Sequence, residues 1–135
     1  MAHTLLSNAR VSSTDRSQIG GLQGEELACG ELRRLGYSIL ARRYRTRFGE
    51  IDIVSERAGT VVFVEVKARS TGRYGDASAS IPFWKQRRLA AMALDYLAWT
   101  NRLSSRCRFD VVAIDGFGTD RMAIRVIENA FWIDR

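Results

Sequence analysis

The chain has 135 residues, of which 46% are hydrophobic and 27% are charged, so it is long enough to bury the core of one domain and is not a disordered chain. Its formal net charge of +6 favours a polyanionic partner, although a protein that is simply basic has the same charge. The only histidine, His3, lies in a polar N-terminal segment, which argues against histidine-centred nucleases, serine–histidine triads and histidine-rich zinc sites.

The cysteines and the apolar runs indicate the cellular compartment in which the protein is expected. Cys29 and Cys107 are far apart and lack the spacing of a zinc site, and the longest apolar runs, such as residues 61–64, are too short to span a membrane. Since no apolar signal stretch precedes the domain, we expect a reduced, cytoplasmic setting without membrane contact. We expect residues 1–19 to form a flexible tail and residues 20–135 a single domain.

The first half of the domain is predicted to contain one helix and three strands. Apolar residues recur at helical spacing over residues 22–35, and Gly36 then ends the helix. Strands are expected over residues 37–44, 50–54 and 60–67, and the third strand is dense in β-branched residues.

The second half is predicted to contain one helix and two strands. After a polar loop over residues 69–80, Pro82 stands where the first turn of a helix accepts it, and this helix is expected to run to about residue 100. Strands follow over residues 109–114 and 122–127. This order of elements predicts a mixed sheet with helices packed on it.

The second and third strands are expected to form a hairpin whose two-residue turn is Ala58-Gly59. Partner numbers then sum to 117, which places Asp52 directly opposite Glu65 and Glu50 opposite Lys67. Two opposed carboxylates about 5 Å apart repel by roughly 3 kcal/mol at an effective dielectric of about 20. A shared proton, a neighbouring ammonium or a divalent cation such as Mg²⁺ would offset this repulsion.

Both helices are predicted to turn a charged side chain inward. Glu25 is in phase with the apolar stripe of the first helix, and Lys85 with that of the second. Lys67 and Lys85 are the only lysines among 21 basic residues, as expected where a compact ammonium that can lose its proton is required.

A purely structural interpretation of the same residues stays open. Glu65 and Lys67 could form an ion pair, with Asp52 bridging at a strand end, because ion-pair networks also perturb carboxylates. Burying these charges in the most apolar strand is nevertheless costly unless they serve a purpose.

Two short segments resemble the metal-binding core of the PD-(D/E)XK nucleases, namely Gly-Glu-Ile-Asp at residues 49–52 and Phe-Val-Glu-Val-Lys at residues 63–67. Over roughly residues 20–131, the wider series of motifs resembles the bacterial YraN-like family. Its motifs are Gly24-Glu25-x-x-Ala28, Phe48-Gly49-Glu50-Ile51-Asp52, Phe63-Val64-Glu65-Val66-Lys67, Tyr74-Gly75, Lys85-Gln86-x-x-Leu89, Arg108-Phe109-Asp110-Val111-Val112 and Asn129-Ala130-Phe131.

The resemblance implies an α/β fold with a restriction-endonuclease-like αβββαβ core, a mixed β-sheet flanked by helices, similar to that of Holliday-junction resolvases. It also implies a set of metal ligands for Mg²⁺ or Mn²⁺, which are Glu25, Asp52 and Glu65. The proline that names the superfamily motif is absent, since Ile51 precedes Asp52.

The same resemblance makes Lys67 the catalytic lysine and puts Lys85 and Gln86 at a helical position that often supports the site. Asp110 also matches the family, and we expect it to be structural, paired with an arginine.

The expected activity is a metal-dependent endonuclease that hydrolyses phosphodiester bonds of nucleic acid, with DNA, including branched DNA, favoured over RNA. A homodimer would provide the two sites that two cuts need. Four arginines are expected to bind the nucleic-acid backbone, Arg69, Arg73, Arg87 and Arg88. Tyr74 and Trp84 either stack on an unpaired base or belong to the core or its rim.

Two other functions remain open from the sequence. One is a nucleic-acid-binding module that keeps the nuclease-like core without turnover. The other is a protein-interaction scaffold whose basic surface meets an acidic protein and whose carboxylates form an ion-pair network.

Overall fold

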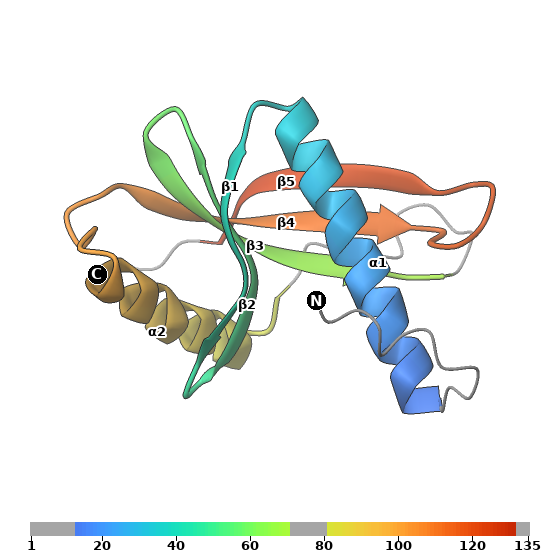
Figure 1. The fold of residues 1–135 in the computed structure, drawn as a ribbon, viewed down its shortest axis with the longest axis horizontal. Coiled ribbons are helices and arrows are strands. Elements are labelled where there is room, and N and C mark those ends of the chain that lie inside the picture. The colour runs from blue at the N-terminus through green and yellow to red at the C-terminus, as the bar shows by residue number, and fades with distance from the viewer. Residues whose placement is uncertain (1–12, 71–80, 132–135) are drawn as a thin grey trace.

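The computed structural model describes residues 13–70 and 81–131, with the backbone alone for residues 13–20. The elements in chain order (Figure 1) are α1 (Ser13–Arg34), β1 (Ser38–Thr46), β2 (Gly49–Arg57), β3 (Thr60–Ala68), α2 (Phe83–Trp99), β4 (Cys107–Asp115) and β5 (Ala123–Phe131). The strands form one sheet in the order β1-β2-β3-β4-β5, in which β3 and β4 are parallel and the other neighbours antiparallel. The predicted α/β class, mixed sheet and αβββαβ order are confirmed.

The largest boundary difference lies at the start of the first helix. α1 begins at Ser13, whereas the apolar periodicity predicted a start at residue 22. Residues 13–19 therefore lie in the helix, although they were expected in the tail, because this polar segment has no apolar repeat from which a helix could be recognised. The rest of the expected tail lies outside the described residues.

The β2–β3 hairpin has the predicted register. Ala58 and Gly59 both have positive φ angles, of 52° and 81°, as a two-residue hairpin turn requires. The paired residues run from Arg57 opposite Thr60 to Ile53 opposite Val64, so their numbers sum to 117. Beyond this point β2 pairs only with β1 and β3 only with β4, and Figure 1 shows the β1–β2 hairpin bending away from β3.

The two helices cover opposite faces of the sheet, and each face has its own apolar cluster (Figure 1). On the α1 side, Ala28, Cys29 and Leu32 pack with Val62 and Val64 of β3. Because side chains alternate along a strand, the neighbouring β3 residues point to the other face. This two-sided burial explains why β3 is almost continuously apolar.

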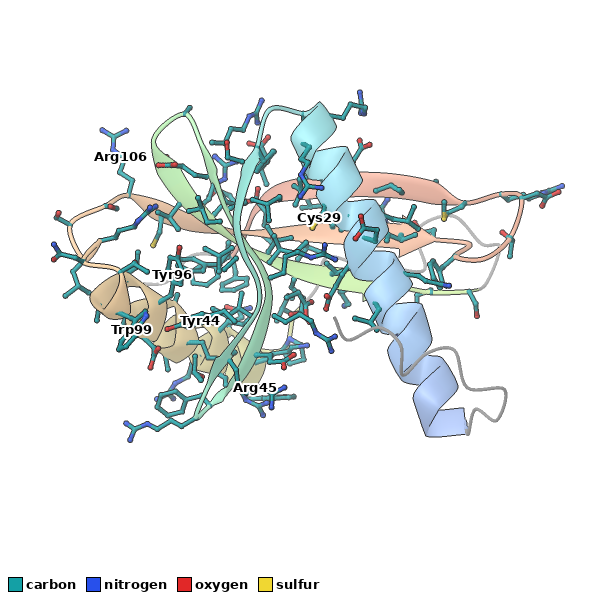
Figure 2. All side chains as sticks on the ribbon, viewed as in Figure 1. Cys29, Tyr44, Arg45, Tyr96, Trp99 and Arg106 are labelled. Carbon is teal, nitrogen blue, oxygen red and sulfur yellow. The ribbon has the colours of Figure 1, made fainter. Side chains whose placement is uncertain are left out.

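The α2 side is rich in aromatic contacts. Phe63 of β3 packs there with Leu89, Met92 and Leu97 of α2. The rings of Tyr44 in β1 and Tyr96 in α2 meet edge to face, with centroids 5.1 Å apart (Figure 2). Among residues 13–70 and 81–131, no helix is long and apolar enough to cross a membrane.

Candidate active site

Four of the predicted site residues come together where β2 and β3 separate: Asp52 on β2, Glu65 and Lys67 on β3, and Lys85 on α2. Asp52 lies one residue past the last paired position, and its Oδ2 accepts a hydrogen bond of 2.8 Å from the backbone N–H of Val66. Lys85 Nζ donates to Glu65 Oε2 at 2.5 Å. The predicted inward direction of Lys85 is confirmed, and its ammonium reaches a carboxylate of the sheet.

Asp52 has the most perturbed carboxyl group of the site. Its pKa is raised from 3.8 to about 7, first by burial and then by the negative charge of Glu65. The Val66 amide and the Lys85 ammonium lower the pKa but do not offset these effects. The β2–β3 pairing ends before Asp52, so the predicted direct pairing of Asp52 with Glu65 is not made. The Glu65 charge nevertheless acts on Asp52 and raises its pKa.

Lys67 follows Glu65 by two residues on β3, so the two side chains share a face. Burial lowers the pKa of the Lys67 ammonium below its usual 10.5, and the charges of Arg69 and Lys85 lower it further, while Glu65 acts in the opposite direction. A lysine whose pKa is lowered in this way can give up its proton more easily and serve as a base.

Glu25 lies on α1 and is buried, as predicted. Its Oε1 is buried without a hydrogen-bond partner, and Arg43 Nε lies 3.8 Å away. Burial raises the pKa of the Glu25 carboxyl, while the charge of Arg43 lowers it. Glu25 also raises the pKa of Asp52, so its charge is felt at the centre of the site.

The three predicted ligands do not form a single ligand group. Across the part of the chain that the structure describes, no group of three or more His, Cys, Asp and Glu side chains is placed to hold a metal ion. Asp52 and Glu65 remain as a mutually repelling pair, with Glu25 as a buried carboxylate that has an unsatisfied oxygen. Mg²⁺ is commonly bound by only one or two carboxylates and keeps water and phosphate oxygens as its other ligands. This donor set therefore fits a hard divalent cation.

Glu65 and Asp52 also make contacts of the kind that a purely structural role requires. The ion pair of Glu65 is made with Lys85, and Asp52 does bridge two strands through the Val66 amide. The bridging role accounts for the hydrogen bond to one oxygen of Asp52. The pKa of the carboxyl nevertheless stays raised, because burial and the Glu65 charge outweigh this bond.

Arg43 is a site residue that the sequence analysis missed. Its backbone is left-handed, with a φ of 53°, a conformation that is costly for a residue with a side chain. The β1–β2 register, in which Arg42 pairs with Ile53 and Tyr44 with Ile51, puts Arg43 across from Asp52. The only sequence signal was a run of arginines over residues 42–47, which does not single out one of them.

Glu50 has a different partner from the expected one. The hairpin register placed it opposite Lys67, but the β2–β3 pairing ends before this position. Glu50 pairs instead with Arg45 of β1, whose Nη2 donates to its Oε2 at 2.6 Å, and Arg43 Nε lies 3.8 Å from its other oxygen.

The predicted nucleic-acid-binding arginines lie on two segments. Arg69 is exposed directly after β3, and Arg87 and Arg88 are exposed on the first turns of α2. Arg73 and Tyr74 lie outside the described residues.

The remaining family positions are structural in their contacts. Gln86 Nε2 donates to the carbonyl oxygen of Ile81 at 2.9 Å, so it holds the start of α2. Buried Asp110 accepts hydrogen bonds from Tyr37 Oη at 2.9 Å, Arg108 Nε at 3.0 Å and the Asn129 backbone N–H at 3.1 Å. The expected pairing of Asp110 with an arginine is confirmed.

Comparison with known proteins identifies the family. The model of the uncharacterised protein family UPF0102 matches residues 24–114. A UPF0102 protein of Symbiobacterium thermophilum is 44% identical over 111 residues, 82% of this chain and 94% of its own. A second, from Geobacter sulfurreducens, is 43% identical over 115 residues, 85% of this chain and 90% of its own.

Among solved structures, SfsA of Pyrococcus furiosus in complex with Ca²⁺ aligns with a TM-score of 0.39 and 17% identity, over 83% of this chain and 63% of that one. The family match and the relatives together agree with the resemblance to the YraN-like proteins. The chain belongs to the uncharacterised protein family UPF0102.

Proposed function

We propose that this protein is a cytoplasmic, metal-dependent endonuclease that hydrolyses phosphodiester bonds of nucleic acid, with DNA as the preferred substrate. The observation that carries the proposal is the grouping of two repelling carboxylates, Asp52 and Glu65, with a half-buried lysine, Lys67, whose pKa is lowered. A divalent cation would relieve the repulsion within the pair, and the lysine supplies a group that can move a proton.

Asp52 and Glu65 would hold Mg²⁺ or Mn²⁺. The buried carboxylate of Glu25, whose charge acts on Asp52, would add to the negative potential that attracts the cation. Such an ion, when bound, polarises a phosphoryl group and activates water for attack on phosphorus. A cation bound to both Asp52 and Glu65 would also relieve the repulsion between the two carboxylates, which contributes to the raised pKa of Asp52.

The two lysines have different tasks in this mechanism. Lys67, with its pKa lowered, takes the proton from the attacking water or, as an ammonium, neutralises charge that develops on the phosphate. Lys85 neutralises Glu65 in the metal-free protein and holds that carboxylate in place until a cation takes the position of the ammonium. Exposed Arg69, Arg87 and Arg88 would bind phosphates on either side of the scissile bond.

Cleavage assays test the proposal. End-labelled branched, flapped, duplex and single-stranded DNA, and RNA, are incubated with the protein in Mg²⁺, Mn²⁺ or EDTA. We expect metal-dependent cleavage that falls by about 100-fold or more in Asp52→Ala and Lys67→Ala, while Asp120→Ala, which removes an exposed loop carboxylate, is unaffected. Cleavage that persists in EDTA, or equally in both site variants, would contradict the proposal.

A non-catalytic nucleic-acid-binding module is the second candidate. It is favoured by the fact that Lys85 and the Val66 amide already satisfy one oxygen each of Glu65 and Asp52. It predicts binding whose affinity falls steeply with salt, with no cleavage of any substrate in either metal. A homodimer would matter only for the first candidate, since two cuts need two sites.

A further inference from the structure

Two consecutive large aromatic side chains are exposed at the start of α2. Phe83 is 70% and Trp84 59% exposed, and exposed apolar side chains that lie together, unlike those scattered singly, are typical of a binding surface. Each ring has an arginine one helical turn later. Arg87 Cζ lies 5.9 Å from the centroid of the Phe83 ring, and Arg88 Cζ lies 4.9 Å from that of Trp84.

A third pair of the same kind comes from the turn between β1 and β2. Phe48 is 40% exposed, and Arg47 Cζ lies 4.9 Å from its ring centroid. Gly49, the residue of β2 that follows Phe48, lies beside α2, since a Cβ built on it would be 3.8 Å from Arg88 Cδ. The two segments therefore form one aromatic–arginine surface, which consists of Arg47, Phe48, Phe83, Trp84, Arg87 and Arg88.

The aromatic–arginine surface adjoins the carboxylates of the candidate active site. Lys85, whose ammonium binds Glu65, follows Trp84 directly in the first turn of α2. Successive helical residues point about 100° apart, so one residue of this turn faces the site while its neighbour faces solvent. The exposed ring of Trp84 therefore stands one residue from the ammonium that binds Glu65.

We propose that the aromatic–arginine surface binds unpaired nucleotides, with the rings stacking on bases and the guanidinium groups holding phosphates. The proposal rests on the proposed nuclease function and narrows its substrate class to nucleic acid that is single-stranded beside the scissile bond. Arginines alone would bind the phosphates of a duplex equally well. Exposed rings add something only when bases are unpaired, because a duplex hides the faces on which they stack.

Binding measurements in EDTA test this inference without requiring cleavage. Fluorescence anisotropy is recorded with a labelled oligothymidylate, a duplex of equal length, an abasic oligonucleotide that has phosphates but no bases, and an oligouridylate that separates DNA from RNA. The variants are Trp84→Ala, Phe83→Ala and the conservative Trp84→Phe. Trp99→Ala is the matched control, since Trp99 is 81% exposed at the other end of α2 (Figure 2), about 22 Å from Trp84 at 1.5 Å per residue.

We expect the wild type to bind the oligothymidylate more tightly than the duplex or the abasic strand. Trp84→Ala and Phe83→Ala should each weaken binding to the oligothymidylate by about fivefold or more, the lower end of what base stacking contributes. Neither variant should change binding to the abasic strand, and Trp84→Phe and Trp99→Ala should bind as the wild type does.

Equal affinity for oligothymidylate and duplex would overturn the inference, as would a loss in Trp84→Ala no larger than that in Trp99→Ala. Binding to anionic phosphatidylglycerol vesicles that depends on Trp84, with oligothymidylate binding unaffected, would assign the surface to a membrane and also overturn it. The inference and the nuclease proposal fail separately. A protein that binds unpaired bases through Trp84 but never cleaves supports the surface alone, and one that cleaves with no effect of Trp84 supports the nuclease alone.

Discussion

Replacement of Asp52 with asparagine is expected to stabilise the metal-free protein at alkaline pH. Burial and the neighbouring Glu65 charge raise the pKa of this carboxyl to about 7. Above that pH, the folded protein holds an ionised carboxylate that water would solvate better in the unfolded chain. Asparagine removes the charge and keeps an oxygen that can accept the hydrogen bond from the Val66 N–H.

The sign and size of the effect follow from the pKa. Because the folded pKa lies above the unfolded value, the folded protein binds more protons between pH 3.8 and about 7, and its free energy of unfolding falls as the pH rises through this window. The full difference corresponds to about 4 kcal/mol, at about 1.4 kcal/mol per pKa unit. Since the Asp52 carboxyl is half-buried and water screens part of its charge, we expect roughly 2 kcal/mol.

Urea unfolding in EDTA measures this effect. Wild type and Asp52→Asn are compared at about pH 5 and about pH 8, and the stability gained by the variant should be larger at the higher pH. Asp120→Asn, which changes an exposed carboxyl, should stay within about 0.5 kcal/mol of the wild type at both. If Asp52→Asn is no more stable than the wild type at the higher pH, or gains equally at both, the reasoning about this carboxyl is wrong.

Three further substitutions probe the surroundings of this carboxyl. Lys85→Ala removes the ammonium that pairs with Glu65, so we expect the melting temperature in EDTA to fall and Mn²⁺ to restore most of the loss. No recovery with Mn²⁺ would argue against a metal at Glu65. Lys67→Arg replaces an amine of lowered pKa by a group that keeps its proton, so the rate of DNA cleavage should fall by about 100-fold and lose the rise with pH that the wild type shows as its lysine deprotonates. An equal pH profile in both proteins would exclude Lys67 as the base. Asp110→Ala removes the buried acceptor of four hydrogen bonds, two of them from Arg108, which should cost about 3 kcal/mol in urea unfolding while the cleavage rate of the folded fraction is unchanged; a selective loss of cleavage would place Asp110 in the site.

The hairpin that positions the site could be predicted from the sequence because two independent signals agree. Alternation in β2 and the dense β-branched residues of β3 indicate the two strands, and the turn at Ala58-Gly59 selects the register. A slip of one residue would reverse the faces of both strands, which both apolar clusters forbid.

The contacts of the charged groups could not be predicted in the same way. Periodicity indicates that Lys85 faces inward, but only the packing of α2 on the sheet decides that its ammonium reaches Glu65. The separation of β2 from β3 beyond Ile53 is likewise invisible in the alternation, so the bond between Asp52 and the Val66 amide was not expected. The left-handed backbone of Arg43 has no sequence signal, since glycine or asparagine would be the usual residue there.

Anomalous diffraction from a crystal soaked in Mn²⁺ tests the central claim most directly, because it locates the cation independently of any cleavage. We expect one Mn²⁺ between the carboxylates of Asp52 and Glu65, with the Lys85 ammonium displaced from Glu65, and no such peak in crystals of Asp52→Asn. Saturating Mn²⁺ that leaves this position empty, with Lys85 still bound to Glu65, would contradict a metal-dependent site.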